Sequence, residues 1–240
     1  MNAQGISSDD EPERAGERMR RDCAFIDSLE IPWAFTPGNH DYAADWNDVR
    51  QVLVDSPHAC TEPEREFGNE VIGLFSEQTS KPAWELLFVN SGRQWDFPDW
   101  LSAATATKPG HVPFRQDAVP TIFFFHIPLR AYQEAIDRAH AVGIAGEDVL
   151  HAGDEDGLGA RFFTLYAGAR GCFCGHSHRN DFFFVQDDVV FSYGRATGHG
   201  GYGGEDLAKG AKLIALDPAS SRFSFKTVFA DGREWSAEMS

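Results

Sequence analysis

The sequence has few basic residues for its length. Its 240 residues include 21 Lys and Arg against 37 Asp and Glu, which gives a formal net charge of −16 at pH 7. Proteins that bind nucleic acid or an anionic membrane surface rely on clustered Lys and Arg side chains. The composition therefore argues against both partners. It does not argue against a small anionic substrate, because a local metal ion can reverse the sign of the field at one site.

Cysteine and long apolar runs are also scarce. The sequence has 4 cysteines, and these are too few and too scattered for a disulfide framework in a chain of this length. A reducing compartment such as the cytoplasm is therefore favoured. Cys172 and Cys174 alternate along an apolar stretch. They could be a metal-ligand or redox pair, or they could be small buried residues of a strand, and we favour the buried residues. No apolar run reaches the ~18 residues of a membrane span, and no targeting stretch follows Met1.

Nothing in the sequence divides the chain. The hydrophobic content of 42% can supply one substantial core, and no segment has the composition of a low-complexity linker. We therefore expect residues 1–240 to form one domain, without an internal repeat.

What the sequence does contain is three short polar segments that each follow an apolar run. They are Gly38-Asn39-His40-Asp41, the histidine of Phe123-Phe124-Phe125-His126-Ile127-Pro128, and Gly175-His176-Ser177-His178. Amide oxygen and neutral imidazole are ligands that suit zinc, iron or manganese. In open α/β sheets, sites form outside the carboxyl ends of the strands. The runs at residues 31–35, 119–125 and 169–174 are thus predicted to be strands that carry a metal site.

Together, in this order, the three segments resemble the later motifs of the calcineurin-like metallophosphoesterases, which are dinuclear phosphate-ester hydrolases. Finer likeness in Phe-His-Ile-Pro, in Cys-Gly-His-Ser-His-Arg-Asn-Asp-Phe and in Gly-Arg-Ala-Thr-Gly-His-Gly-Gly-Tyr-Gly indicates the purple-acid-phosphatase-like branch. The resemblance implies an α/β fold, the α/β/β/α sandwich of two mixed sheets flanked by helices. It also implies a metal-dependent phosphatase that acts on a small phosphate ester.

The resemblance assigns a role to six residues. Asn39, His126 and His176 would share one divalent ion of the iron, manganese or zinc type, and His178 would serve a second. His40 would be the general acid that faces the leaving-group oxygen, and Asp41 would orient its imidazole. His176 and His178 would face opposite sides of an extended strand, so the chain is predicted to turn there.

Two motifs of this family are absent from the sequence. An Asp-x-His motif after a first strand, and a Gly-Asp motif after a second, supply the bridging carboxylate and most of the second metal site. The chain thus resembles a domain without its first strands, and Asp9 and Asp10 are interpreted as solvated residues rather than substitutes. Three ligands and a water can still hold a single catalytic zinc. The alternative is a catalytically inactive relic or binding module.

The remaining patterns predict the supporting elements. Apolar spacing and capping residues predict helices at residues 11–29, 45–54, 129–142 and 158–167, a strand at 84–89, and hairpins at 181–192 and 212–229. The glycine-rich stretch at 198–204 is either a phosphate-binding loop of backbone N–H groups or a flexible loop, and we favour the flexible loop. His199 and Tyr202 in this stretch are candidate substrate contacts. Residues 154–156 are predicted to be a solvated acidic turn, because they lack the spacing of a calcium loop.

Overall fold

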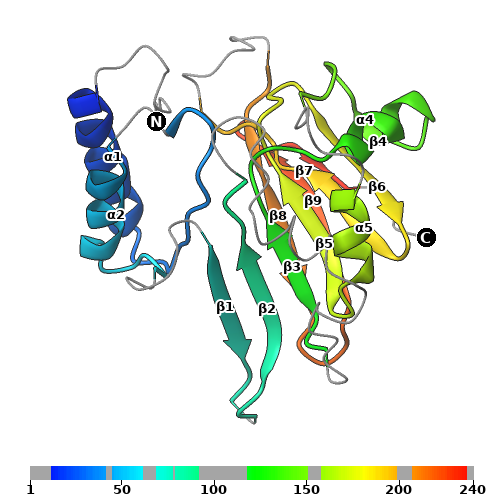
Figure 1. Cartoon of the computed structure of the whole chain (residues 1–240), viewed down its shortest axis with the longest axis horizontal. Coiled ribbons are helices and arrows are strands. Elements are labelled where there is room, and N and C mark those ends of the chain that lie inside the picture. The colour runs from blue at the N-terminus through cyan, green and yellow to red at the C-terminus, as the bar shows by residue number, and fades with distance from the viewer. Residues whose placement is uncertain are drawn as a thin grey trace.

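The computed structural model describes residues 12–41, 45–61, 69–77, 79–91, 118–150, 158–198 and 207–236 (Figure 1). Four helices and ten strands lie in these ranges. The helices are α1 (Pro12–Asp27), α2 (Trp46–Asp55), α4 (Arg130–Asp137) and α5 (Leu158–Leu165). The strands are β1 (Glu70–Phe75), β2 (Pro82–Phe88), β3 (Thr121–Phe124), β4 (Val142–Ile144), β5 (Ala169–Cys174), β6 (Asp181–Gln186), β7 (Val189–Tyr193), β8 (Gly210–Leu216), β9 (Phe223–Phe229) and β10 (Glu234–Trp235).

Two sheets form the centre of the fold. The larger is a seven-stranded mixed sheet in the order β1-β2-β3-β5-β7-β6-β4, and its middle strands β2, β3, β5 and β7 run parallel to one another. The smaller sheet has the order β10-β9-β8 and is antiparallel throughout the described residues. This arrangement confirms the predicted α/β class and is compatible with a phosphoesterase-type sandwich.

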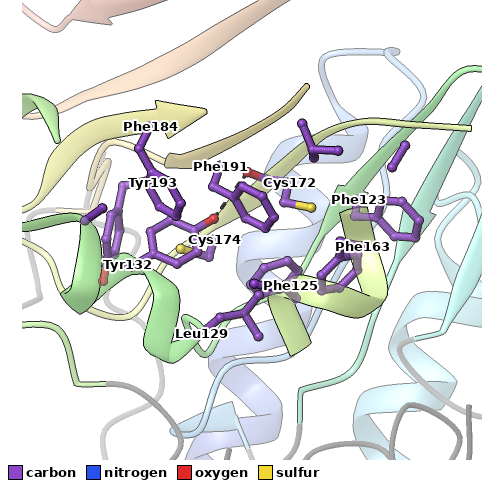
Figure 2. Close-up of a cluster of buried hydrophobic side chains, with 14 of the residues drawn as sticks. Phe123, Phe125, Leu129, Tyr132, Phe163, Cys172, Cys174, Phe184, Phe191 and Tyr193 are labelled. Carbon is purple, nitrogen blue, oxygen red and sulfur yellow. Dashed lines mark hydrogen bonds between the residues drawn. The ribbon is translucent and has the colours of Figure 1, made fainter. Parts of the chain in front are cut away.

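The larger apolar core lies on the face of the seven-stranded sheet that α4 and α5 cover (Figure 2). Tyr132 of α4 is fully buried there, and its hydroxyl donates to the backbone oxygens of Cys172 and Ser192 at 3.3 and 3.4 Å. Cys172 and Cys174 are buried in this core, and burial raises the pKa of both thiols. They are therefore small buried strand residues, as favoured from the sequence.

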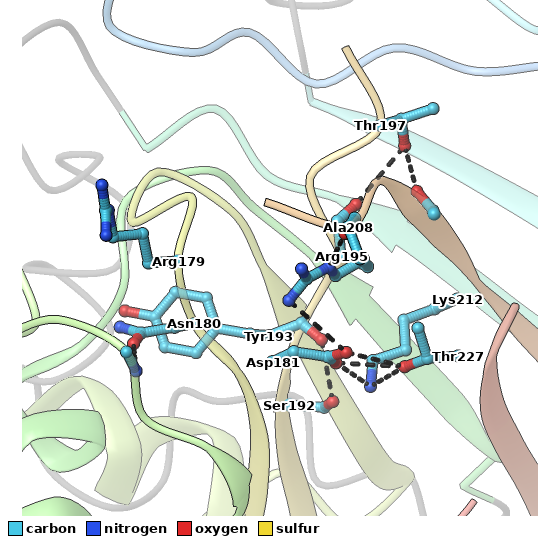
Figure 3. A network of polar contacts seen from close by, with 12 residues as sticks. Arg179, Asn180, Asp181, Ser192, Tyr193, Arg195, Thr197, Ala208, Lys212 and Thr227 are labelled. Atoms are coloured by element: carbon cyan, nitrogen blue, oxygen red, sulfur yellow. Dashed lines mark hydrogen bonds and ion pairs between the residues drawn. The ribbon is translucent and has the colours of Figure 1, made fainter. Parts of the chain in front are cut away.

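The two sheets pack face to face over a second core and share one buried ionic cluster (Figure 3). Asp181 of β6 has no exposed surface, and Lys212 Nζ of β8 lies 2.6 Å from its carboxylate. Thr227 Oγ1 of β9 donates to the same carboxylate at 3.0 Å, and Arg195 Nη1 lies 3.9 Å from it. Buried charges need partners of this kind, so the cluster ties the second sheet to the first.

Helices α1 and α2 form a pair with a small core of their own. Met19 and Cys23 of α1 meet Val49, Val52 and Leu53 of α2. Helix α2 begins after an Asp45 N-cap, whose side chain accepts from the Asn47 backbone N–H at 2.8 Å. In Figure 1 this α1–α2 pair stands beside the sheets rather than on either face of them.

Two predictions about elements were wrong. The apolar run at 31–35 is not a strand, because within the described residues it makes only the isolated bridge of Trp33 to Ala59. The helix predicted at 129–142 ends at Asp137, and Val142 then begins the short strand β4. Ala139 terminates the helix with a positive φ of 55°, and the backbone N–H of His140 returns to Ala135 O at 2.8 Å.

No helix among the described residues is both long and apolar enough to cross a membrane.

Candidate functional site

The three segments singled out in the sequence meet at one end of the seven-stranded sheet. Asn39 Oδ1 lies 3.0 Å from His126 Nε2, and His126 Nε2 lies 3.3 Å from His176 Nδ1. The two imidazole rings are 5.2 Å apart between centroids and inclined at 75°. Asn39 and His176 lie 87 and 50 residues from His126 in the sequence, yet both contact the same His126 nitrogen, Nε2.

Parallel pairing explains why the two imidazoles meet. Phe124 of β3 pairs with Phe173 of β5, so both strands end at the same edge of the sheet. His126 follows β3 and His176 follows β5, and the backbone N–H of Gly175 donates to His126 O at 3.1 Å. The carboxyl-end rule that guided the sequence interpretation therefore holds for these two residues.

Ser91 supports the site and was not identified from the sequence. Its Oγ accepts from the backbone N–H groups of His126 and Ile127 at 3.3 and 2.9 Å, and the residue is buried. A signal for it exists, because Ser91 follows the apolar run of β2, which is the parallel neighbour of β3. A polar residue just past a strand at the same edge is a candidate for the same site.

Gly38 allows the Asn39 segment to approach His126. A Cβ atom at this glycine would lie 2.9 Å from His126 Cε1 and 3.0 Å from both ring nitrogens. Real side-chain atoms do not pack that closely, so any residue larger than glycine would push the ring away. Glycine is used here because the backbone must come close to another group.

The chain turns at the second histidine pair, as predicted. His176 has a φ of +76°, which is rare for a residue with a side chain, and Ser177 N–H and Asn180 N–H donate to Gly175 O and Ser177 O at 3.0 and 3.2 Å. The turn also brings His178 near the cluster. After burial, the charge of His178 is the largest cause of the lowered pKa of His176.

Both central imidazoles are held neutral. Burial, followed by the charges of His176, His178 and His40, lowers the pKa of His126 to about 3. Burial, His178 and His40 lower the pKa of His176 to about 4, against a smaller opposing effect of Glu147. At neutral pH each ring is therefore in the uncharged form that can bind a cation.

His40 and Asp41 form a tight turn beside these rings. The Asp41 carboxylate accepts from the backbone N–H of Gly38 at 2.7 Å, and the backbone N–H of Asp41 donates to Gly38 O at 3.1 Å. Burial raises the pKa of Asp41, while the Gly38 N–H and the charge of His40 oppose that rise. His40 is exposed, and its charge acts on both His126 and His176, so it borders the cluster from the solvent side.

The donor set fits one divalent cation. Ligands about 2.0–2.1 Å from a tetrahedral zinc lie about 3.3 Å from one another. The separations of 3.0 and 3.3 Å along Asn39, His126 and His176 agree with that geometry. Among the described residues there is no group of three or more His, Cys, Asp or Glu side chains that could hold a metal ion, so a cation here would also need the Asn39 amide. These residues do not supply a carboxylate-bridged pair of ions.

Several residues considered in the sequence lie outside the described ranges. They are Asp9, Asp10, residues 154–156, His199 and Tyr202.

Comparison with known proteins gives a partial match. A scan against models of protein families found none that fits the chain. The chain is 24% identical over 230 residues to a probable inactive purple acid phosphatase 28 of Arabidopsis thaliana, which covers 82% of this chain. It is 24% identical over 233 residues to a probable inactive purple acid phosphatase 14 of the same plant, which covers 80% of this chain. The chain spans 57% of the length of each relative. It is thus similar to purple-acid-phosphatase-like proteins, in line with the resemblance carried by its motifs.

Proposed function

We propose that the chain is a metal-dependent phosphoesterase that binds one divalent cation through Asn39, His126 and His176. The observation that carries this proposal is that two candidate donor atoms contact a third, since His126 Nε2 lies 3.0 Å from Asn39 Oδ1 and 3.3 Å from His176 Nδ1. A cation held there would polarise a phosphoryl oxygen and lower the pKa of a water molecule. The substrate we propose is a small phosphate ester.

The chain's own residues would orient the ester and move one proton. His40 is exposed at the border of the cluster, so its imidazole can reach a leaving-group oxygen. The hydrogen bonds between Asp41 and Gly38 fix the turn on which His40 stands. Proton donation by a positioned side chain typically contributes about 10²–10⁴-fold to a rate.

The first test is metal content of the purified chain by elemental analysis, paired with hydrolysis of an aryl phosphate in added manganese, zinc or iron. We expect close to one cation per chain. The variants His126→Ala and His176→Ala should lose both the cation and turnover. The matched control is His140→Ala, which removes an exposed imidazole at the end of α4 and should change neither quantity. A chain that takes up no cation would refute the proposal.

His40 needs a separate test, because it is not one of the three donors. His40→Ala should lower kcat about 10²–10⁴-fold and leave cation binding unchanged. A variant that loses the cation as well would mean that His40 acts as a ligand rather than as an acid.

A second candidate is a protein that binds a cation and phosphate without turnover. Two observations favour it: both relatives are named as probably inactive, and the described residues offer no carboxylate-rich metal group. Isothermal titration with zinc and inorganic phosphate separates the two candidates. Binding of both, together with no hydrolysis of the aryl phosphate in any of the three metals, would support the second.

A further inference from the structure

The turn that carries His176 and His178 is clamped from outside the sheet by a loop at residues 146–150. The backbone N–H groups of Gly146 and Glu147 both donate to Asn180 Oδ1, at 2.9 and 3.1 Å. Asn180 is fully buried at the end of the turn (Figure 3). One amide side chain thus holds two successive N–H groups of the loop.

A second set of hydrogen bonds links the loop and the turn in both directions. The backbone N–H of Arg179, in the turn, donates to Glu147 Oε1 of the loop at 2.9 Å. The backbone N–H of Leu150 donates to the buried Ser177 Oγ at 3.4 Å, and Tyr193 OH bonds the same hydroxyl at 3.3 Å. The loop and the turn therefore satisfy one another's backbone groups, and the Glu147 carboxylate provides the charged member of the set.

The loop is itself anchored, so it can act as a support. Val149 is buried, and its backbone N–H donates to Gln133 Oε1 of α4 at 2.7 Å. Gly146 lies so close to the turn that a Cβ atom there would come within 2.6 Å of Arg179 O. Nothing larger than glycine fits between loop and turn at this point.

The turn needs a support because it is strained and lies beyond the sheet. His176 has a positive φ of 76°, a conformation that persists only where surrounding contacts over-determine it. Strand β5 ends at Cys174 and strand β6 begins at Asp181, so the turn lies between the two strands rather than within either of them. The Glu147 charge also acts on the His176 imidazole, which places the carboxylate close to the cluster.

We propose that Glu147 is a positioning residue for His176 and His178: its carboxylate and backbone clamp the turn so that both imidazoles face the Asn39–His126 pair. The inference rests on the proposed function in so far as those imidazoles bind a cation. Residues that orient metal ligands from outside typically change affinity or activity about 10–100-fold when they are replaced.

The test compares Glu147→Ala with Glu147→Gln. Glutamine keeps an oxygen that can accept from Arg179 N–H, and alanine keeps none. The matched control is Asp148→Ala, which removes the same charge from the adjacent, exposed loop position. We expect the zinc dissociation constant, measured by competition with a chromophoric chelator, to rise about 10–100-fold in Glu147→Ala. Glu147→Gln should recover most of the affinity, and Asp148→Ala should match the unaltered chain.

A second readout does not depend on a cation. Amide hydrogen exchange at Arg179, and the imidazole ¹⁵N resonances of His176 and His178, report the clamp and the rings directly. In Glu147→Ala, Arg179 exchange should accelerate and the two imidazole resonances should broaden or split. If exchange accelerates but the imidazole resonances and zinc affinity stay unchanged, the positioning role is wrong. If the unaltered chain binds no zinc, the proposed function is wrong. The imidazole resonances of Glu147→Ala then still test whether Glu147 positions the two rings.

Discussion

At the scale of single residues, the fold keeps two imidazoles of the site, those of His126 and His176, uncharged. The pKa of His126 falls to about 3 and that of His176 to about 4, whereas each would be 6.5 in an ordinary environment. The same burial that frees their lone pairs for a cation makes their protonation costly. A low pH should therefore lower the free energy of unfolding, because these two rings bind protons more weakly in the folded chain than in the unfolded chain.

We predict that the metal-free chain loses stability as the pH falls from about 6.5 to about 4. In this window the unfolded chain binds protons that the folded chain does not, so the free energy of unfolding decreases, by about 1.4 kcal/mol per pH unit for each ring that stays neutral. The contribution is complete above pH 6.5 and levels off below the folded pKa values. Urea unfolding with a chelator present checks it. His126→Gln should flatten the dependence and His140→Ala should not; an unchanged slope in His126→Gln would contradict the prediction.

Gly38 is the glycine whose replacement would act directly on the His126 ring. We predict that Gly38→Ala destabilises the chain by about 1–3 kcal/mol and weakens zinc binding, because its Cβ would lie 2.9 Å from the His126 ring. Gly16→Ala is the control, since a Cβ in α1 meets its nearest neighbour, Asp48, at an ordinary 3.5 Å. Helical glycine to alanine should stabilise by about 0.5–1 kcal/mol. Urea unfolding of both variants tests the contrast, and equal effects would contradict it.

At the scale of elements, the sequence predicted those strands whose partners are also apolar runs. β3 and β5 were recognisable because each is a short hydrophobic stretch, and their ends predicted where His126 and His176 lie. The run at 31–35 is just as apolar, yet it makes a single bridge among the described residues. Strand formation depends on a neighbour to pair with, and composition does not reveal whether the neighbour is there.

The end of α4 could not be predicted for a different reason. Helices commonly stop at a glycine or asparagine in the left-handed region, but here an alanine, Ala139, takes that conformation. The contacts of Asn180 with Gly146 and Glu147 could not be predicted, because they join residues more than 30 positions apart that meet only in the folded chain. Ser91 has a signal in the sequence, its place just past the apolar run of β2, but that signal points to the site only once β2 is known to pair with β3.

The strained end of α4 gives a prediction at this scale. Ala139→Gly should raise the free energy of unfolding by about 1 kcal/mol, because a left-handed conformation costs an L-residue about 1–2 kcal/mol that glycine does not pay. Ala131→Gly, in the first turn of the same helix, should lower it, because glycine is less favourable than alanine in a helix. Thermal or urea unfolding measures both, and a destabilised Ala139→Gly would show that the backbone differs from the one described.

At the scale of the whole molecule, the two sheets depend on the charge cluster around Asp181. Removing that carboxylate leaves the buried Lys212 ammonium without a charged partner, although its bond to Thr227 Oγ1 remains. We predict that Asp181→Ala lowers the free energy of unfolding by about 3–5 kcal/mol. Glu234→Ala, which breaks the exposed pair with Lys226, should change it by about 1 kcal/mol or less. Asp181→Leu combined with Lys212→Met should recover part of the loss in urea unfolding; no recovery would mean that packing rather than charge is at stake.

The separate core of the α1–α2 pair has a consequence for binding as a whole. Asn39 and His40 lie between α1 and α2 in the sequence, whereas the other imidazoles belong to the sheet. A cation bound by donors from both parts would link the segment between α1 and α2 to the sheet. Each part would then present its donors to the other at an effective concentration set by the peptide between them. Binding of the cation and packing of the α1–α2 pair would then be coupled. A substitution that destabilises the pair would lower the affinity for the cation even though it alters no donor atom.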